Sequence, residues 1–74
     1  MTRVNSENIT RAIETIEKLK TQGINQYHQL DDGTQYYTYE KLLGFEMAVG
    51  ILLGEEHPLY AVASEAARQL INSI

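Results

Sequence analysis

The stretch LLGFEMAVGILLG, residues 42–54, decides how this chain folds. When it is projected on a helix at 100° per residue, apolar side chains surround nearly the whole circumference, and helices of that kind are buried. The stretch is shorter than the roughly 20 apolar residues that cross a membrane, so we expect it to be the central helix of a globular domain. Two neighbouring helices and a small hairpin cannot cover every side of it. The apolar surface left uncovered predicts a subunit interface, most simply that of a homodimer, formed by Leu42, Phe45, Val49 and Leu52.

Capping residues predict where the helices begin and end. The central helix is expected over residues 38–54, from Thr38, a good N-cap residue, to Gly54, a typical C-cap residue. An amphipathic helix is expected before it, over residues 5–22. Asn5 suits the N-cap of that helix, and Gly23 suits the position just after its last turn.

A third helix is expected over residues 58–73. His57 is its candidate N-cap, and Pro58 takes the first helical position, where a missing N–H costs nothing. The connection from Gly54 to His57 is short. The second and third helices should therefore form an antiparallel pair.

Residues 24–38 differ from the helical stretches on either side. Asp32 and Gly33 lie between two aromatic-rich runs, which is a strong signal for a two-residue β-hairpin turn. We therefore predict an α+β fold that is mainly α, a single small domain of residues 1–74 with three helices and a short β-hairpin between the first and the second. An extended loop is the alternative for this segment, and an all-α three-helix bundle is the alternative fold.

The composition limits the chemistry and the partners. Ten acidic and six basic side chains among 74 residues give a net charge of −4, which disfavours binding to nucleic acid or to an anionic membrane. No cysteine is present, which excludes disulfides and cysteine nucleophiles and suits a reducing cytoplasm. The chain carries none of the common catalytic or dinucleotide motifs, so we predict neither an enzyme nor a cofactor. A domain this small usually needs added stabilisation, which homo-oligomer formation would supply.

Tyrosines concentrate in the predicted hairpin and are the least ordinary feature of the local composition. Tyrosine is enriched at interfaces because its rigid ring gives a large contact area. We therefore expect a partner or ligand to bind at Tyr27, His28, Gln29, Tyr36 and Tyr37. In the predicted register Tyr27 and Tyr36 share the binding face, while His28 and Tyr37 pack on the helices. The alternative is that cross-strand aromatic pairs only hold the hairpin together.

Glu46 is the only charged residue in the central apolar stretch. It is a candidate buried acid for ligand binding, or the acceptor of a hydrogen bond from a tyrosine or from Arg68; the alternative is that it faces solvent beside Gly50. The acidic turns at residues 31–32 and 55–57 offer possible metal ligands. Acidic side chains at residues 55 and 56 also favour the N-terminus of the next helix, and we assign no metal.

These features predict a small, soluble, homo-oligomeric binding or accessory protein of regulatory or inhibitory type. It would act on an unidentified protein partner through the tyrosine-rich hairpin. The alternative is a small-molecule or metal-binding protein with its site between the hairpin and the helix of residues 38–54.

Overall fold

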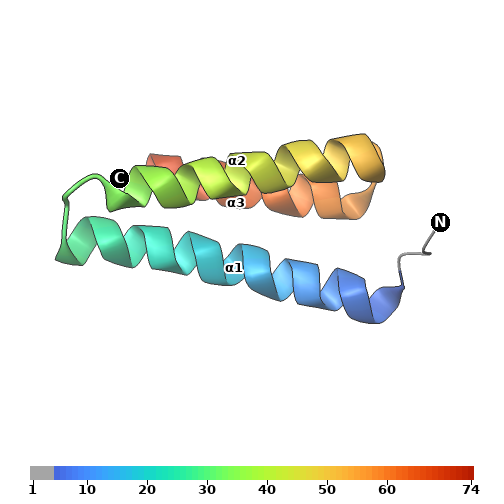
Figure 1. Ribbon diagram of the computed structural model, residues 1–74, viewed down its shortest axis with the longest axis horizontal. Coiled ribbons are helices and arrows are strands. Elements are labelled where there is room, and N and C mark those ends of the chain that lie inside the picture. Colours follow the sequence, from blue (N-terminus) through green and yellow to red (C-terminus); the bar gives the residue numbers. More distant parts are fainter. Residues whose placement is uncertain (1–4) are drawn as a thin grey trace.

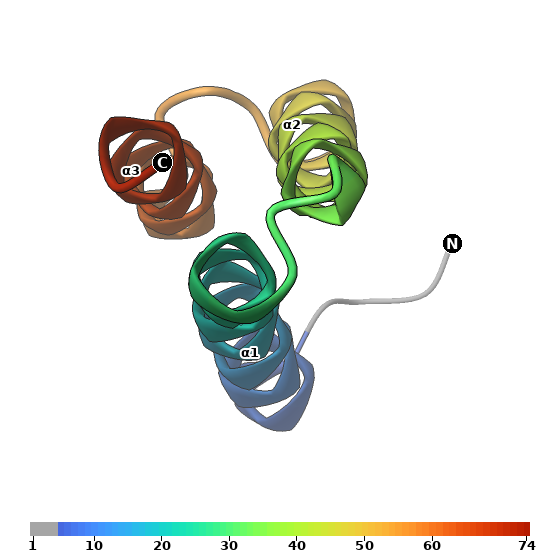
Figure 2. The same ribbon diagram turned by 90° about the vertical axis from the view of Figure 1, so that its left-hand side faces the viewer.

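The computed structural model describes residues 5–74, and three α-helices account for most of them (Figure 1). They are α1 (Ser6–Gln29), α2 (Thr34–Leu52) and α3 (Pro58–Asn72). Each helix runs antiparallel to the one before it, and in the view along the bundle the three lie at the corners of a triangle (Figure 2). Every pair of helices is in contact. This part of the chain is therefore a three-helix bundle.

The predicted β-hairpin over residues 24–38 is wrong, and so is the α+β fold class. Only residues 30–33 lie between α1 and α2, and no strand occurs in residues 5–74. Gln26 and Tyr27 are half-buried and extend the inward side of α1. Packing of this stretch against the other helices outweighs the strand preference of its aromatic residues. The all-α alternative describes the fold.

Gly23 lies inside α1 and does not end it, so the predicted end of the first helix at residue 22 is also wrong. The Cα of Gly23 faces α3: an added Cβ would lie 2.6 Å from Cδ2 and 2.8 Å from Cδ1 of Leu70. Leu70 is itself fully buried. The glycine therefore serves the close approach of α1 and α3, a role that only the tertiary neighbour reveals.

A polar network forms the turn where the hairpin was predicted. Asp31 and Gly33 have positive φ angles of 44° and 95°, which reverse the chain between the two helices. Oδ1 of Asp32 accepts hydrogen bonds from the backbone N–H and the hydroxyl of Thr34, at 3.0 and 2.8 Å. The buried Gln35 side chain accepts from the N–H of Gly33 and donates to Asp31, both at 3.2 Å. The Asp-Gly pair thus lies in a turn, but the turn joins two helices.

The Asp32 interaction predicts a dependence of stability on pH. The hydroxyl of Thr34, and next its backbone N–H, hold the pKa of Asp32 below its ordinary value of 3.8. Because the folded chain has the lower pKa, the carboxylate adds stability above the unfolded pKa, and this stability is lost as the pH falls through the folded pKa. As the pH is lowered from about 5 to about 2, we expect the urea concentration at the unfolding midpoint to decrease. Asp32→Asn should make this decrease smaller.

Thr34→Val is the matched control, because it keeps the Asp32 charge and removes only the hydroxyl donor. Its urea midpoint should have a pH dependence between those of the native chain and Asp32→Asn. The same pH dependence in all three proteins would contradict this role of the turn.

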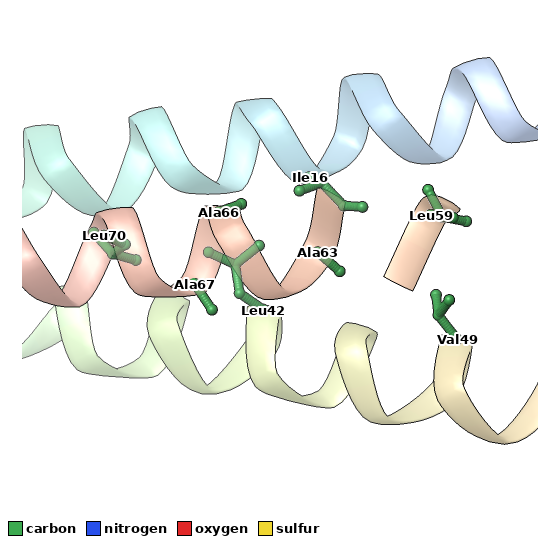
Figure 3. Close-up of a cluster of buried hydrophobic side chains, with 8 residues drawn as sticks. All are labelled: Ile16, Leu42, Val49, Leu59, Ala63, Ala66, Ala67 and Leu70. Atoms are coloured by element: carbon green, nitrogen blue, oxygen red, sulfur yellow. The ribbon is translucent and has the colours of Figure 1, made fainter. Parts of the chain in front are cut away.

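The core lies along the axis of the bundle (Figure 3). α1 contributes Ile16, and α2 contributes Leu42 and Val49. α3 contributes the largest share, Leu59, Ala63, Ala66, Ala67 and Leu70. The small alanine side chains allow the neighbouring helices to approach α3 closely.

Two predicted N-caps are confirmed and one is wrong. Oδ1 of Asn5 accepts a backbone hydrogen bond from the first turn of α1 at 2.9 Å, and Nδ1 of His57 accepts from the N–H of Leu59 at 3.1 Å. Thr38 was predicted to begin the second helix, yet it lies inside α2. Its buried hydroxyl donates to Oε1 of Gln26 at 2.6 Å and so joins α2 to α1.

Candidate interaction surface

α2 exposes large apolar side chains on the side that faces away from the other two helices. Its inward side consists of four buried residues, Gln35, Thr38, Leu42 and Val49. On the opposite side the exposed fractions reach 37% for Leu43, 66% for Met47, 75% for Ile51 and 79% for Leu52. Small, exposed residues lie between these side chains. We define the outer face of α2 as Leu43, Gly44, Met47, Ala48, Ile51 and Leu52.

No charged or polar side chain interrupts the outer face of α2. Glu46, the one charged residue in this half of the helix, is half-buried on the flank toward α3, where it lines a shallow depression with Tyr60. The ring of Tyr60 covers Gly50, at which an added Cβ would lie 3.1 Å from ring carbon Cε2. Burial, followed by the charges of Glu55 and Glu46, raises the pKa of Tyr60 above its ordinary value of 10.0. Glu46 thus lies beside a tyrosine of α3.

An apolar groove of about 280 Å³ opens beside the outer face of α2, near the C-terminal end of that helix. Its lining residues are all apolar: Phe45, Ala48, Val49, Leu52, Leu53 and Leu59. At the same end of the bundle α1 diverges from α2 and α3 (Figure 1). Ala48 and Leu52 belong to both the groove and the outer face, so the two form one continuous apolar surface.

The residues predicted to bind a partner lie near the α1–α2 turn, but on two helices. Tyr27 is half-buried on α1, and its ring centroid lies 5.2 Å from that of His28. His28 and Gln29 are exposed at the end of α1. Tyr36 and Tyr37 are 51% and 70% exposed in the first turn of α2. The hairpin face that Tyr27 and Tyr36 were predicted to share does not form.

The four residues predicted to form a subunit interface are divided between core and surface. Leu42 and Val49 are buried within the single chain, with exposed fractions of 0% and 5%. Phe45 is half-buried in the groove. Leu52 alone among the four belongs to the outer face of α2.

Three large residues of the outer face were missed by sequence reasoning, namely Leu43, Met47 and Ile51. They follow one another at a spacing of four residues and therefore form a single stripe along the helix. This spacing is the signal that identifies them. Other apolar residues conceal it, because they surround nearly the whole circumference of α2 over residues 42–52.

The acidic turns lie at opposite ends of the bundle, residues 31–32 between α1 and α2 and residues 55–56 between α2 and α3 (Figure 1). They therefore cannot contribute to one site. Over the described range, no three His, Asp or Glu side chains come close enough to share a metal ion.

No family model, curated protein or solved structure matches this chain. Within residues 5–74, none of the helices has both the length and the apolarity of a membrane span.

The chemistry that the outer face of α2 offers is simple. It presents apolar area to water, and covering that area is favourable in free energy.

Proposed function

We propose that the protein is a small interaction module that binds another protein through the outer face of α2. The observation that carries the proposal is the exposure of four large apolar side chains on one helix face without an intervening polar group. Monomeric soluble proteins seldom expose large contiguous apolar patches, and such patches mark interaction sites. Full burial of a Leu, Ile or Met side chain is worth about 1.5–3 kcal/mol, so covering four of them favours association.

The proposed role is accessory, regulatory or inhibitory, because the module works by covering a surface of its partner. Tyr36 and Tyr37 are exposed nearer the α1–α2 turn, beyond the charged pair Glu40 and Lys41, and supply aromatic side chains of the kind that dominate binding energy at interfaces. The net charge of −4 favours a protein partner over nucleic acid. We propose the cytoplasm as its compartment, since a chain without cysteine suits reducing conditions.

The apolar groove supports the same proposal better than it supports a small-molecule site. Ligand pockets combine apolar walls with a few polar groups that orient the ligand. The groove has no polar residue in its lining, and the hairpin that was expected to form the other wall of a ligand site is absent from residues 5–74. We therefore assign the groove to the protein-binding surface.

Site-specific photo-cross-linking tests the proposal in cells that make the protein. A benzophenone amino acid at Ile51 or Met47 should give covalent adducts with a protein, because both positions lie on the outer face of α2. The same amino acid at Glu14, an exposed position of α1, is the matched control and should give few adducts. Equal yields at the three positions, or no adduct from α2, would contradict the proposed function.

A further inference from the structure

We infer that the outer face of α2 binds an amphipathic α-helix of another protein, and that this helix carries Lys or Arg at one edge of its apolar stripe. The inference rests on the proposed function, because it states the chemistry of the partner at the same surface. Two features of the molecule support it. The first is the lack of hydrogen-bonding side chains on the face, and the second is the negative charge along its border with α3.

The outer face of α2 favours a helix over an extended segment as its partner. Its six residues carry no polar side chain, and the backbone groups along a helix bond to one another. A segment that lies on the face must therefore satisfy its own backbone N–H and C=O groups. An α-helix does so alone, whereas a β-strand needs a neighbouring strand. The face extends from Leu43 to Leu52, about 14 Å, which equals roughly two and a half turns of a partner helix.

Negative charge without a cationic partner borders the face. Residues 42–67 contain four glutamates and no Lys or Arg. Of the four, Glu65 alone has an ion-pair partner within residues 5–74. The other three are Glu46, Glu55 and Glu56. This border attracts positive charge on a partner, whereas a second copy of the chain carries a net charge of −4 of its own and is repelled.

A depression of about 370 Å³ joins the outer face to this acidic border. Its lining residues are Leu43 and Met47, from the outer face, together with Glu46 and Tyr60. Lys and Arg lay their aliphatic stems along apolar surface and keep the charged end in a polar environment. A basic side chain of the partner therefore fits this depression, with its stem on Leu43 and Met47 and its charge beside Glu46.

Glu55 adds a second carboxylate on the same side of α2. Its Cγ lies 3.6 Å from the position of a Cβ added to Gly50, the glycine that the Tyr60 ring also covers. Burial, followed by the charges of Glu55 and Glu46, raises the pKa of Tyr60, because both carboxylates lie near its hydroxyl. A positive charge of the partner therefore meets two carboxylates on the α3 side of the face and none of the apolar residues on the other side. This asymmetry places the basic residues at one edge of the partner's stripe.

Selection from a peptide library tests the chemistry of the partner. The probe is a displayed library of helical peptides with leucine at positions i, i+3 and i+7 and all residue types at the positions on either side of this stripe. Peptides selected on the native protein should carry Lys or Arg at one edge at least about fivefold more often than Asp or Glu. With Glu46→Gln and Glu55→Gln combined, this ratio should fall below about twofold. Equal frequencies of acidic and basic residues on the native protein, or no selected peptide, would overturn the inference.

Two control variants show that the preference belongs to this surface. Glu7→Gln combined with Glu14→Gln removes the same charge from exposed positions of α1 and should leave the preference for Lys and Arg unchanged. Ile51→Ser, at a side chain that is 75% exposed, should reduce recovery of the selected peptides at least about tenfold. A preference that is lost in the α1 variant, or a recovery that Ile51→Ser leaves unchanged, would show that the peptides bind elsewhere and would overturn the inference.

Photo-cross-linking in cells separates failure of this inference from failure of the proposed function. The adduct from a benzophenone amino acid at Met47 should contain another protein, joined through an amphipathic helix with a basic edge. Adducts with twice the mass of the chain, or with a segment that has no basic edge, would overturn the inference and leave the interaction module in place. No adduct from Met47 or Ile51 would reject both.

Discussion

Leu42→Ala is expected to lower the free energy of unfolding by about 3 kcal/mol. Leu42 is fully buried, and its side chain points from α2 into the cluster that contains Ile16 of α1 and Ala66 of α3 (Figure 3). Truncation removes buried apolar atoms and leaves a cavity that the bundle fills only in part. A domain of 74 residues has a total stability of about 4–11 kcal/mol, so this one change removes a large fraction of it.

Leu52→Ala is the matched control for Leu42→Ala, because it makes the same substitution in the same helix at a side chain that is 79% exposed. Leu52→Ala should lower the free energy of unfolding by less than about 1 kcal/mol, because truncation of an exposed side chain leaves no internal cavity. Urea unfolding followed by circular dichroism measures the loss in both variants. A loss of similar size in the two would show that α2 is rotated from the orientation described.

The contrast between these leucines explains why the interface was only partly predicted. The C-terminal half of α2, residues 42–52, is apolar around nearly its whole circumference, so the sequence specifies that this half is covered but not which side is covered by its own chain. The side that packs inward depends on where α1 and α3 lie. Leu42 and Val49 face those helices, whereas Leu43 and Met47 do not.

The helix ends were predictable where a side chain caps the backbone directly. Asn5 and His57 accept backbone hydrogen bonds within their own helices, so the local sequence contains the whole interaction. The α1–α2 turn was misassigned because Asp-Gly suits several kinds of turn. Contacts between residues far apart in the sequence favour helices on both sides of the turn. One of them is the hydrogen bond from Thr38 to Gln26, which links residues twelve positions apart.

Glycine is the clearest case in which local sequence is insufficient. Gly23, Gly44 and Gly50 all lie within helices, yet their neighbours differ. Gly23 faces Leu70, Gly50 faces the ring of Tyr60, and Gly44 faces open space. A helical pattern interrupted by glycine therefore predicts either a helix end or a close contact, and only the tertiary neighbour decides between them.

Gly23→Val is expected to lower the free energy of unfolding by about 3 kcal/mol. Its Cβ would lie 2.6 and 2.8 Å from the two methyl carbons of Leu70, so one of the two groups must shift, and Leu70 is fully buried in the core. Either Leu70 leaves its packed position or α1 and α3 move apart, and both changes lose core contacts. Gly44→Ala is the control, because its added methyl meets no atom within 4 Å. Gly44→Ala should raise stability by about 0.5–1 kcal/mol through the better helix propensity of alanine.

A double-mutant cycle identifies the contact that causes the loss. Gly23→Ala introduces only the clashing Cβ, and Leu70→Ala removes the methyl groups that it meets. If the clash is the cause, Leu70→Ala should cost less in the Gly23→Ala chain than in the native chain, by at least about 1 kcal/mol. The free energy of unfolding of the four proteins in urea gives this difference. Additive losses would mean that residue 23 does not meet Leu70, and that α1 packs on α3 through another face.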